Sequence, residues 1–441
     1  MSSKRIGLFF LLIGQLTGCS GWWGGEEGSR LPGERIAVMP ELTKIESDAR
    51  LKNLEIRLPK PFRNNEWKQA GGNSHHVMHH LAAKGPFKEI WDTDVGKGSN
   101  KRRQLIGEPV ISDGKIFTID TNAVIQALDS QTGRKLWKRK IKPKKSQETD
   151  GTLGGGISLF GQFLVASTGF GSVICINSGT GKTVWRVNVG APVRSAPTIF
   201  KKRVFVVTLE NKTFALNLIN GQKLWLHSGI SETAMLYGGA SPAAIGSTVV
   251  VSYSSGELFA LRLENGRQIW RDSLTALKRT DPISAIAHIR GRPIIDRGMV
   301  IASANSGRTV AIDLRTGVRI WERYIGSSQN PWLIGDFIFL ITNGSRLVCL
   351  TRKMGLVKWV SQLPRFEDMD KRENPIYWTS PLIAGDRLLI GGSNGEVWSI
   401  SPYTGKKQFK AKLSDPIFIA PVIANETIYF LTDDATLTAF K

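Results

Sequence analysis

The stretch Ala127-Leu-Asp129-Ser-Gln-Thr-Gly133-Arg-Lys-Leu-Trp137 decides the fold, because its spacing returns along the chain. A glycine lies four residues before an aromatic residue in seven segments: Gly133/Trp137, Gly181/Trp185, Gly221/Trp225, Gly266/Trp270, Gly317/Trp321, Gly355/Trp359 and Gly405/Phe409. Ten positions before each aromatic stands a small residue: Ala127, Cys175, Ala215, Ala260, Ala311, Cys349 and Ser399. A proline precedes the aromatic by 28 residues in every segment except the second, which has Ile157. The chain is therefore built from units of constant internal length.

Each unit has the pattern of short antiparallel strands separated by turns. In the third unit, Val204–Thr208 and Thr213–Asn217 are rich in β-branched and aromatic residues, and Asn220-Gly221 is a turn signal before Lys223–Trp225. Such runs between Gly and Asn turns indicate antiparallel strands. Four strands in a unit of ~40–50 residues are typical of a β-propeller blade.

The two ends of the chain complete an eighth unit. After the seventh unit the pattern restarts at Pro421 but reaches Lys441 without a tryptophan-bearing strand, whereas Phe87–Val95 carries such a strand around Trp91. Because a closed ring leaves no open sheet edge between blades, we expect the N-terminal strand to close it. The sequence thus predicts an all-β, eight-bladed propeller over residues 86–441, with structural docking tryptophans at Trp91, Trp137, Trp185, Trp225, Trp270, Trp321 and Trp359.

The N-terminus has the pattern of a secretion signal. Lys4 and Arg5 precede the apolar run Ile6–Leu12, and Leu16-Thr-Gly-Cys19 follows, which resembles a bacterial lipobox. We therefore expect residues 1–18 to be a lipoprotein signal peptide and Cys19 to be the lipidated mature N-terminus, the alternative being an ordinary signal peptide with an incidental cysteine. Ser20 stands where aspartate retains many Gram-negative lipoproteins in the inner membrane. The expected location is the periplasmic face of the outer membrane, with a lipid anchor.

Residues 19–85 are expected to be a lipidated tether and lead-in segment. The part up to about residue 60 is Gly-rich and then mixed in charge, which is typical of a flexible tether. The following Trp67…Gly71-Gly72-Asn73 stretch resembles the lead-in of PQQ-type propellers.

Composition narrows the partner class. The chain of 441 residues has 59 Lys+Arg against 37 Asp+Glu, a formal net charge of +22, which attracts anionic partners at long range. The basic runs Lys101–Arg103 and Lys138–Lys145 lack interleaved aromatic residues, so nucleic-acid binding is not expected. Lipopolysaccharide phosphates, peptidoglycan carboxylates and acidic protein faces remain as candidates.

The ending Ala-Leu-Asp129-x-x-Thr-Gly133-x-x-x-Trp137, echoed at Ala311–Trp321, resembles the PQQ-type tryptophan-docking repeat. With the lipobox and eight blades, the chain is similar to the BamB family of outer-membrane protein assembly factors, over roughly residues 87–441 plus the signal. The resemblance implies a scaffold of the β-barrel assembly (BAM) complex that binds the periplasmic POTRA domains of BamA. It would assist folding and insertion of outer-membrane β-barrels beside the other BAM lipoproteins, and nascent outer-membrane proteins are further candidate partners.

The resemblance also implies a partner-binding site on two interblade loops. Leu236, in the loop 233–239, matches the family's apolar contact, and Tyr237 stands where many members have Arg. His288 and Arg290, in the next interblade loop, stand where members carry two Asp. With the charge reversed, either the site lies elsewhere or the partner carries the opposite charge in turn. The alternative is that these are long solvated loops that bind no partner.

The same propeller also carries enzymes, which require residues that this chain lacks. A PQQ-dependent dehydrogenase holds its quinone with adjacent cysteines and uses a calcium ion with an Asp base, whereas no two cysteines are adjacent here. The acids Asp368, Asp370 and Glu373 share a single loop. We therefore expect no enzyme activity, no catalytic residues, no cofactor and no metal site. An envelope lipoprotein that binds glycan through its basic loops is the other alternative.

Three further features suggest chemistry but have plainer interpretations. Ser178–Thr183 resembles the end of a phosphate loop, yet Ile176 replaces the required first glycine. The cluster His75–His80 lacks a complete set of metal ligands and is interpreted as a polar segment packed beside the propeller. Cys175 and Cys349 occupy opposite blades, too far apart for a disulfide, and are interpreted as small core residues.

Overall fold

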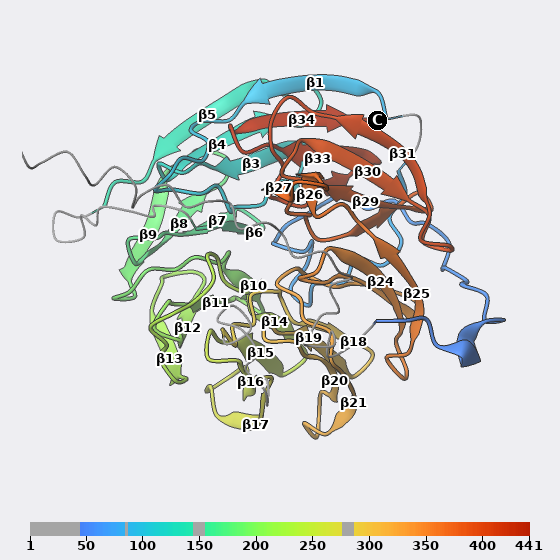
Figure 1. The fold of residues 1–441 in the computed structure, drawn as a ribbon. Helices are drawn as coiled ribbons and strands as arrows, with labels where there is room; N and C mark the ends of the chain where they lie inside the picture. The colour runs from blue at the N-terminus through green and yellow to red at the C-terminus, as the bar shows by residue number, and fades with distance from the viewer. Residues whose placement is uncertain (1–44, 84–86, 144–154, 276–285) are drawn as a thin grey trace, which may run out of the picture. The chain divides into compact units, whose positions relative to one another are not determined.

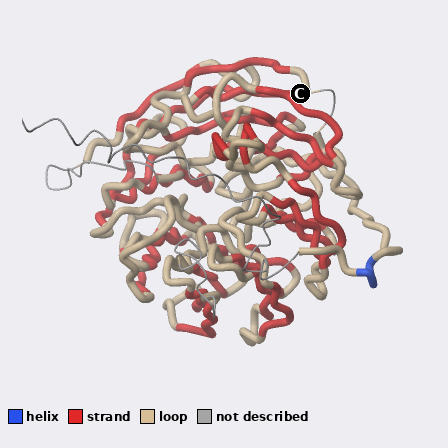
Figure 2. Tube along the Cα trace, in the orientation of Figure 1, coloured by secondary structure: helices blue, strands red, loops and turns tan. Residues whose placement is uncertain are grey.

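The computed structural model describes residues 45–83, 87–143, 155–275 and 286–441. The expected signal peptide and the expected lipidation site, Cys19, lie outside these ranges. Within them the only helix is the short 3-10 turn η1 (Ala49–Leu51), so no described helix is long enough to cross a membrane. All other regular secondary structure in these ranges is β-strand, connected by turns and loops, as Figure 2 shows.

Eight four-stranded antiparallel sheets form the blades, each from an inner to an outer strand (Figure 1). Blade 1 comprises β2 (Val110–Ser112), β3 (Lys115–Ile119), β4 (Val124–Asp129) and β5 (Lys135–Lys140), and blade 2 comprises β6 (Ile157–Phe160), β7 (Phe163–Ser167), β8 (Ser172–Asn177) and β9 (Thr183–Asn188). Blade 3 comprises β10 (Thr198–Phe200), β11 (Arg203–Val207), β12 (Lys212–Asn217) and β13 (Lys223–Ser228). Blade 4 comprises β14 (Ala243–Ile245), β15 (Thr248–Ser252), β16 (Glu257–Arg262) and β17 (Gln268–Ser273).

Blade 5 comprises β18 (Ile294–Asp296), β19 (Met299–Ser303), β20 (Thr309–Asp313) and β21 (Arg319–Arg323). Blade 6 comprises β22 (Trp332–Ile334), β23 (Phe337–Ile341), β24 (Arg346–Thr351) and β25 (Val357–Gln362). Blade 7 comprises β28 (Leu382–Ala384), β29 (Arg387–Gly391), β30 (Glu396–Ile400) and β31 (Lys407–Lys412). Blade 8 comprises β32 (Val422–Ala424), β33 (Thr427–Leu431), β34 (Thr436–Phe440) and β1 (Glu89–Asp94). A separate hairpin, β26 (Phe366–Asp368) and β27 (Glu373–Pro375), lies between blades 6 and 7.

The predicted closure of the ring is confirmed. The N-terminal strand β1 pairs antiparallel with the C-terminal strand β34, and Trp91 lies opposite Ala439. The first and last strands of the propeller are thereby joined in one sheet, at the top of Figure 1. Phe87, just before β1, adds a ring contact with Phe409 of blade 7 at 5.7 Å between centroids.

Strand register explains the small residue of each repeat. It lies directly opposite the aromatic of the outer strand, as in Ala127 with Trp137 and Cys175 with Trp185, and a β-bulge follows. Cross-strand neighbours share one face of a sheet, so a small side chain leaves space for the large indole beside it. Cys175 and Cys349 are both free and fully buried at this position, and burial raises the pKa of Cys175 to about 12.

The blades are held together by tryptophans that dock on glycines of the next blade. The indole N–H donates to a carbonyl of the following blade at 2.7–3.0 Å from Trp137, Trp185, Trp225, Trp270, Trp321 and Trp359. The turn glycine of that blade faces the same ring. At Gly133, Gly181, Gly221, Gly266, Gly317, Gly355 and Gly405, φ is +64° to +76° and an added Cβ would come within 2.6–3.1 Å of the indole. Glycine is needed there for both its backbone freedom and its missing side chain.

Residues 59–83, here called the lead-in segment, follow the inner strands around the ring. They hydrogen-bond to each blade in turn: Asn64 to Ile423 of β32, Trp67 to Ile111 of β2, Lys68 to Leu159 of β6, Gln69 to Ile199 of β10, Ser74 to Ala244 of β14, His75 to Ile295 of β18, His79 to Trp332 of β22, and Leu81 to Gly385 beside β28. An inner strand is a sheet edge whose unpaired backbone groups require partners. The segment supplies them, and the Gln69 amide even bonds both the N–H and the C=O of Ile199, at 2.8 and 2.9 Å.

Residues 45–58 differ from the flexible tether expected up to about residue 60. The backbone N–H of Asp48 donates to Val357 O of β25 at 2.8 Å, and Lys358 Nζ donates to Leu51 O at 2.7 Å. Leu51 is buried, and Ile56 belongs to the core shared by blades 6 and 7. This stretch therefore lies on the outer edge of blade 6, because it carries apolar side chains that composition alone did not distinguish from a tether.

The Trp–Gly contact can be tested within one blade. Gly317 and Gly298 have almost the same φ, +76° and +74°, but only Gly317 faces an indole, at 2.6 Å, whereas nothing lies within 4 Å of a Cβ at Gly298. We expect Gly298→Ala to cost about 1–2 kcal/mol for the left-handed backbone alone. Gly317→Ala should cost clearly more in denaturant unfolding at equal protein concentration. Equal losses of unfolding free energy in the two variants would show that the contact with the indole does not require glycine at position 317.

A second prediction concerns pH. His76 is buried, its Nδ1 lies 2.8 Å from Pro293 O, and burial lowers its pKa to about 3. The unfolded chain takes up a proton near pH 6.5, which the folded chain resists until about pH 3, so the free energy of unfolding falls as pH is lowered through this window. His76→Asn tolerates the positive φ of 62° and cannot titrate. When the pH is lowered from 7 to 5, the free energy of unfolding of this variant, measured with urea, should fall by about 2 kcal/mol less than that of the wild type. Equal losses would contradict the assignment.

Candidate functional site

The interblade loops enclose a cavity of about 620 Å³ on the axis of the ring. The residue just before the repeat proline lines it in seven blades: Glu108, Ala196, Ser241, Arg292, Asn330, Ser380 and Ala420. This placement follows from the fold, because each of these residues stands at the start of an inner strand. Ala70 of the lead-in segment also lines the cavity, which gives it a floor.

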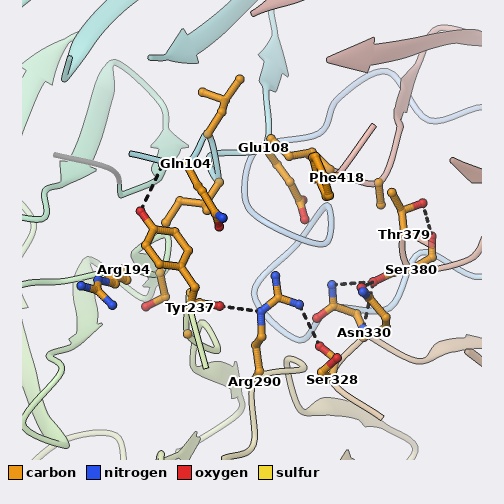
Figure 3. Close-up of a pocket in the computed structure, with 18 of the residues that line it drawn as sticks. Gln104, Glu108, Arg194, Tyr237, Arg290, Ser328, Asn330, Thr379, Ser380 and Phe418 are labelled. Atoms are coloured by element: carbon orange, nitrogen blue, oxygen red, sulfur yellow. Dashed lines mark hydrogen bonds between the residues drawn. The ribbon is translucent and has the colours of Figure 1, made fainter. Parts of the chain in front are cut away.

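The two loops predicted to bind a partner meet at this cavity (Figure 3). The backbone N–H of Leu236 donates to His288 Nδ1 at 3.1 Å. Arg290 Nε donates to Tyr237 O at 2.8 Å, and its Nη1 donates to Ser328 O of the next interblade loop at 3.1 Å. The second loop therefore holds the first in place, and Leu236, Tyr237 and Arg290 all line the cavity.

Tyr237 connects the loop to other parts of the rim. Its hydroxyl accepts from the backbone N–H of Gln104 at 3.3 Å, and the Arg194 guanidinium lies 4.9 Å from the centre of its ring. A stacked guanidinium on an aromatic face is a favourable cation–π contact. Gly238, with φ of +93°, brings the backbone so close that a Cβ would lie 3.2 Å from Arg290 Nε. A side chain at this position would crowd Arg290 and strain the backbone.

One ion pair lies deep in the cavity. Glu108 accepts the backbone N–H of Gly71 at 3.0 Å and pairs with Arg292 at 2.6 Å, and both side chains are largely buried. The carboxylate therefore links the lead-in segment to the start of blade 5 by a charge-assisted bond. Beside it, Asn330 bonds the backbone N–H of Arg292 and the hydroxyl of Ser380, so the polar floor is internally paired.

Two side chains of the site have displaced pKa values. Burial lowers the pKa of His288 to about 4, with a further contribution from the charge of Arg290. The imidazole is neutral at pH 7, as its acceptor role toward Leu236 requires. Burial also lowers the pKa of Arg290, and the Arg292 charge adds to this effect. A guanidinium remains protonated under all ordinary conditions.

The four predicted residues thus differ in accessibility. His288 is only 4% exposed and supports the Leu236 backbone from within, whereas Leu236, Tyr237 and Arg290 are partly exposed to the cavity. Leu236 and Tyr237 lie in the concave wall of the cavity. The residues before the repeat prolines were not predicted as part of the site, although the repeat spacing marks their common position.

The remaining sequence candidates lie elsewhere. His75–His80 belongs to the lead-in segment, where His80 Nδ1 lies 2.6 Å from Pro59 O and the backbone N–H of Asp386 donates to His80 Nε2. In the parts of the chain that the structure describes, no three His, Cys, Asp or Glu side chains gather as a metal site. Asp368 and Glu373 are paired residues of the β26–β27 hairpin.

The fold and the cavity define an eight-bladed propeller of tryptophan-docked repeats with an interblade-loop site. Residues 121–361 and 366–441 match the family model described as outer membrane protein assembly factor BamB, and the chain belongs to this family. The resemblance seen in the sequence is therefore confirmed. A relative of that name from Xanthomonas campestris is 24% identical over 449 aligned residues, which cover 99% of this chain and 97% of the relative.

Solved structures show the same fold at lower identity. The crystal structure of BamB from Moraxella catarrhalis matches with a TM-score of 0.68 and 17% identity, covering 81% of this chain and all of that one. Quinohemoprotein alcohol dehydrogenase from Comamonas testosteroni matches with a TM-score of 0.67 and 13% identity, over 86% of this chain and 81% of the enzyme. These likenesses establish the propeller and carry no activity with them.

The hydrogen bond between Leu236 and His288 predicts the stability of the first loop. His288→Ala removes the acceptor, and since such a bond is worth about 1 kcal/mol, the Leu236 amide should exchange with solvent deuterium about fivefold faster. His227→Ala, which removes a ring bonded to Tyr253 instead, is the control and should leave Leu236 unchanged. An unaltered Leu236 exchange rate in His288→Ala would show that the loop is held by other contacts.

Proposed function

We propose that this protein is a non-catalytic scaffold of the β-barrel assembly machinery, which binds the POTRA domains of BamA at the mouth of its central cavity. One observation carries the proposal: the two loops that the family resemblance assigns to the partner meet at a single cavity, with Leu236 and Tyr237 in its wall. Membership of the BamB family supports the setting. Assistance to folding and insertion of outer-membrane β-barrels follows from this role.

The proposal includes the location. The lipobox-like Leu16-Thr-Gly-Cys19, followed by Ser20, favours an acylated Cys19 that holds the protein at the periplasmic face of the outer membrane. Several acyl chains anchor firmly, since each buried CH₂ contributes ~0.8 kcal/mol. The other BAM lipoproteins are expected neighbours at this surface, with nascent outer-membrane proteins as further candidate partners.

Catalysis is not part of the proposal. The dehydrogenase likeness is confined to the fold, and the three cysteines, Cys19, Cys175 and Cys349, include no adjacent pair of the kind that holds the quinone. The carboxylates in the cavity are already engaged, Glu108 by Arg292 and Asp433 by the Ser99 hydroxyl. A rigid ring with a concave rim needs only loops to bind a protein partner.

Copurification tests the proposal. The full-length lipoprotein is extracted from its native membrane in mild detergent, and Leu236→Asp is compared with Leu226→Asp, the same change at a 43%-exposed site on the outer strand β13. A charge buried against an apolar partner is costly, so BamA recovery with Leu236→Asp should fall roughly tenfold or more, which corresponds to at least about 1.4 kcal/mol. Leu226→Asp should recover BamA as the wild type does.

Either of two results would overturn the proposal. One is BamA absent from the wild-type preparation, and particularly its replacement by peptidoglycan fragments, which would favour the glycan-binding alternative. The other is equal loss of BamA in Leu236→Asp and Leu226→Asp, which would show that the cavity is not where BamA binds.

A further inference from the structure

Arg290 is the cation of the cavity that has no counter-charge. Among the residues that the structure describes, its guanidinium bonds only two carbonyl oxygens, of Tyr237 and Ser328, and no carboxylate lies within ion-pair distance. Arg292, two residues later, has Glu108 at 2.6 Å. A largely buried charge without an opposite charge is costly, and the cost is relieved when an anion arrives.

The geometry leaves Arg290 able to receive such an anion. Its Nε and Nη1 are engaged, whereas Nη2 has no hydrogen bond among the described residues. Figure 3 shows Arg290 between Tyr237 and Asn330. Since the two carbonyl bonds hold the guanidinium plane in position, the free edge is preorganised for a carboxylate.

The surroundings of the mouth are also basic. Lys101 and Arg102 are exposed in the turn between Asn100 and Gln104, both of which line the cavity. In the described ranges neither forms an ion pair, and Arg194 adds a third cation on Tyr237. Asp433 is the acidic residue of the wall besides Glu108, and it bonds the Ser99 hydroxyl. Asp415 and Asp434 lie close to Asp433 and offset part of this basic charge, so the attraction for an acidic ligand is centred on the Arg290 side of the cavity.

The opposite wall is aromatic and reachable. Tyr377 is 62% exposed and Phe418 is 45% exposed, and both line the cavity from the loops that precede blades 7 and 8. Tyr237 precedes blade 4, so Phe418 faces it across the eight-bladed ring (Figure 3). Exposed aromatic side chains across a cavity from a partly buried arginine are the composition of a protein-binding centre. A cavity of about 620 Å³ holds several side chains and is far larger than a single inorganic anion needs.

We propose that the cavity receives an acidic segment of a protein partner, whose Asp or Glu carboxylate pairs with Arg290 while a neighbouring apolar side chain packs on Phe418 and Tyr377. The inference deepens the proposed function and rests on it in taking the occupant to be part of a protein. It assigns the acidic member of the contact to the partner, and the basic member to this chain.

Peptide binding tests the inference directly. The probe is acetyl-Gly-Phe-Asp-Phe-Gly-amide, compared with its Asn counterpart, titrated calorimetrically into the full-length lipoprotein in detergent. The wild type should bind the Asp peptide at least tenfold more tightly than the Asn peptide. Arg290→Gln should abolish this preference, whereas Lys138→Gln, which removes an exposed charge from the outer strand β5, should retain it. Tyr377→Ala and Phe418→Ala should weaken both peptides alike.

Equal affinity of the wild type for the two peptides would overturn the inference, and so would an unchanged preference in Arg290→Gln. If Arg290→Gln fails to fold, by its circular dichroism and melting temperature, the wild-type comparison and the Tyr377→Ala variant still decide. If the wild type prefers the Asp peptide but does not copurify with BamA, the proposed function alone is contradicted. Copurification of BamA without any Asp preference would contradict this inference alone.

Discussion

The structure depends on the contact between a tryptophan and the turn glycine of the next blade. Each indole lies over a glycine that has positive φ and no side chain, and six of them also donate to a carbonyl of that blade. Trp91 makes the closing contact on Gly133, beside the Tyr429 ring at 5.8 Å. In a closed ring, a shift of one blade shifts the blades beside it. This repeated contact therefore determines the positions of the interblade loops.

Closing the ring creates a second requirement, since every inner strand presents an unpaired edge to the central axis. The lead-in segment meets it with one backbone or side-chain partner per blade. The same segment supplies the floor of the cavity at Ala70, and Gly71 is bonded by Glu108, which in turn pairs with Arg292. Stability of the ring and shape of the site are thus produced by the same residues.

The site combines residues that support and residues that a ligand can reach. His288 is buried and neutral and holds the Leu236 backbone, whereas Arg290 holds the Tyr237 backbone and still presents a free edge to the cavity. A glycine at 238 permits this approach. His288 and Arg290 therefore support the first loop from within, and Arg290 adds a positive charge to the cavity wall.

The sequence by itself determined the blades, their number and their closure, because Gly133, Trp137, Ala127 and their repeats report local turn geometry and cross-strand register, which operate over a few residues. It also pointed to two loops. Only the tertiary structure decided that the lead-in segment lines the inner strands, that residues 45–58 lie on blade 6, and that Glu108, Asn330 and Phe418 share one cavity. These residues lie on different blades, and whether a charge such as Arg290 is paired depends on distances across the ring, which repeat spacing does not contain.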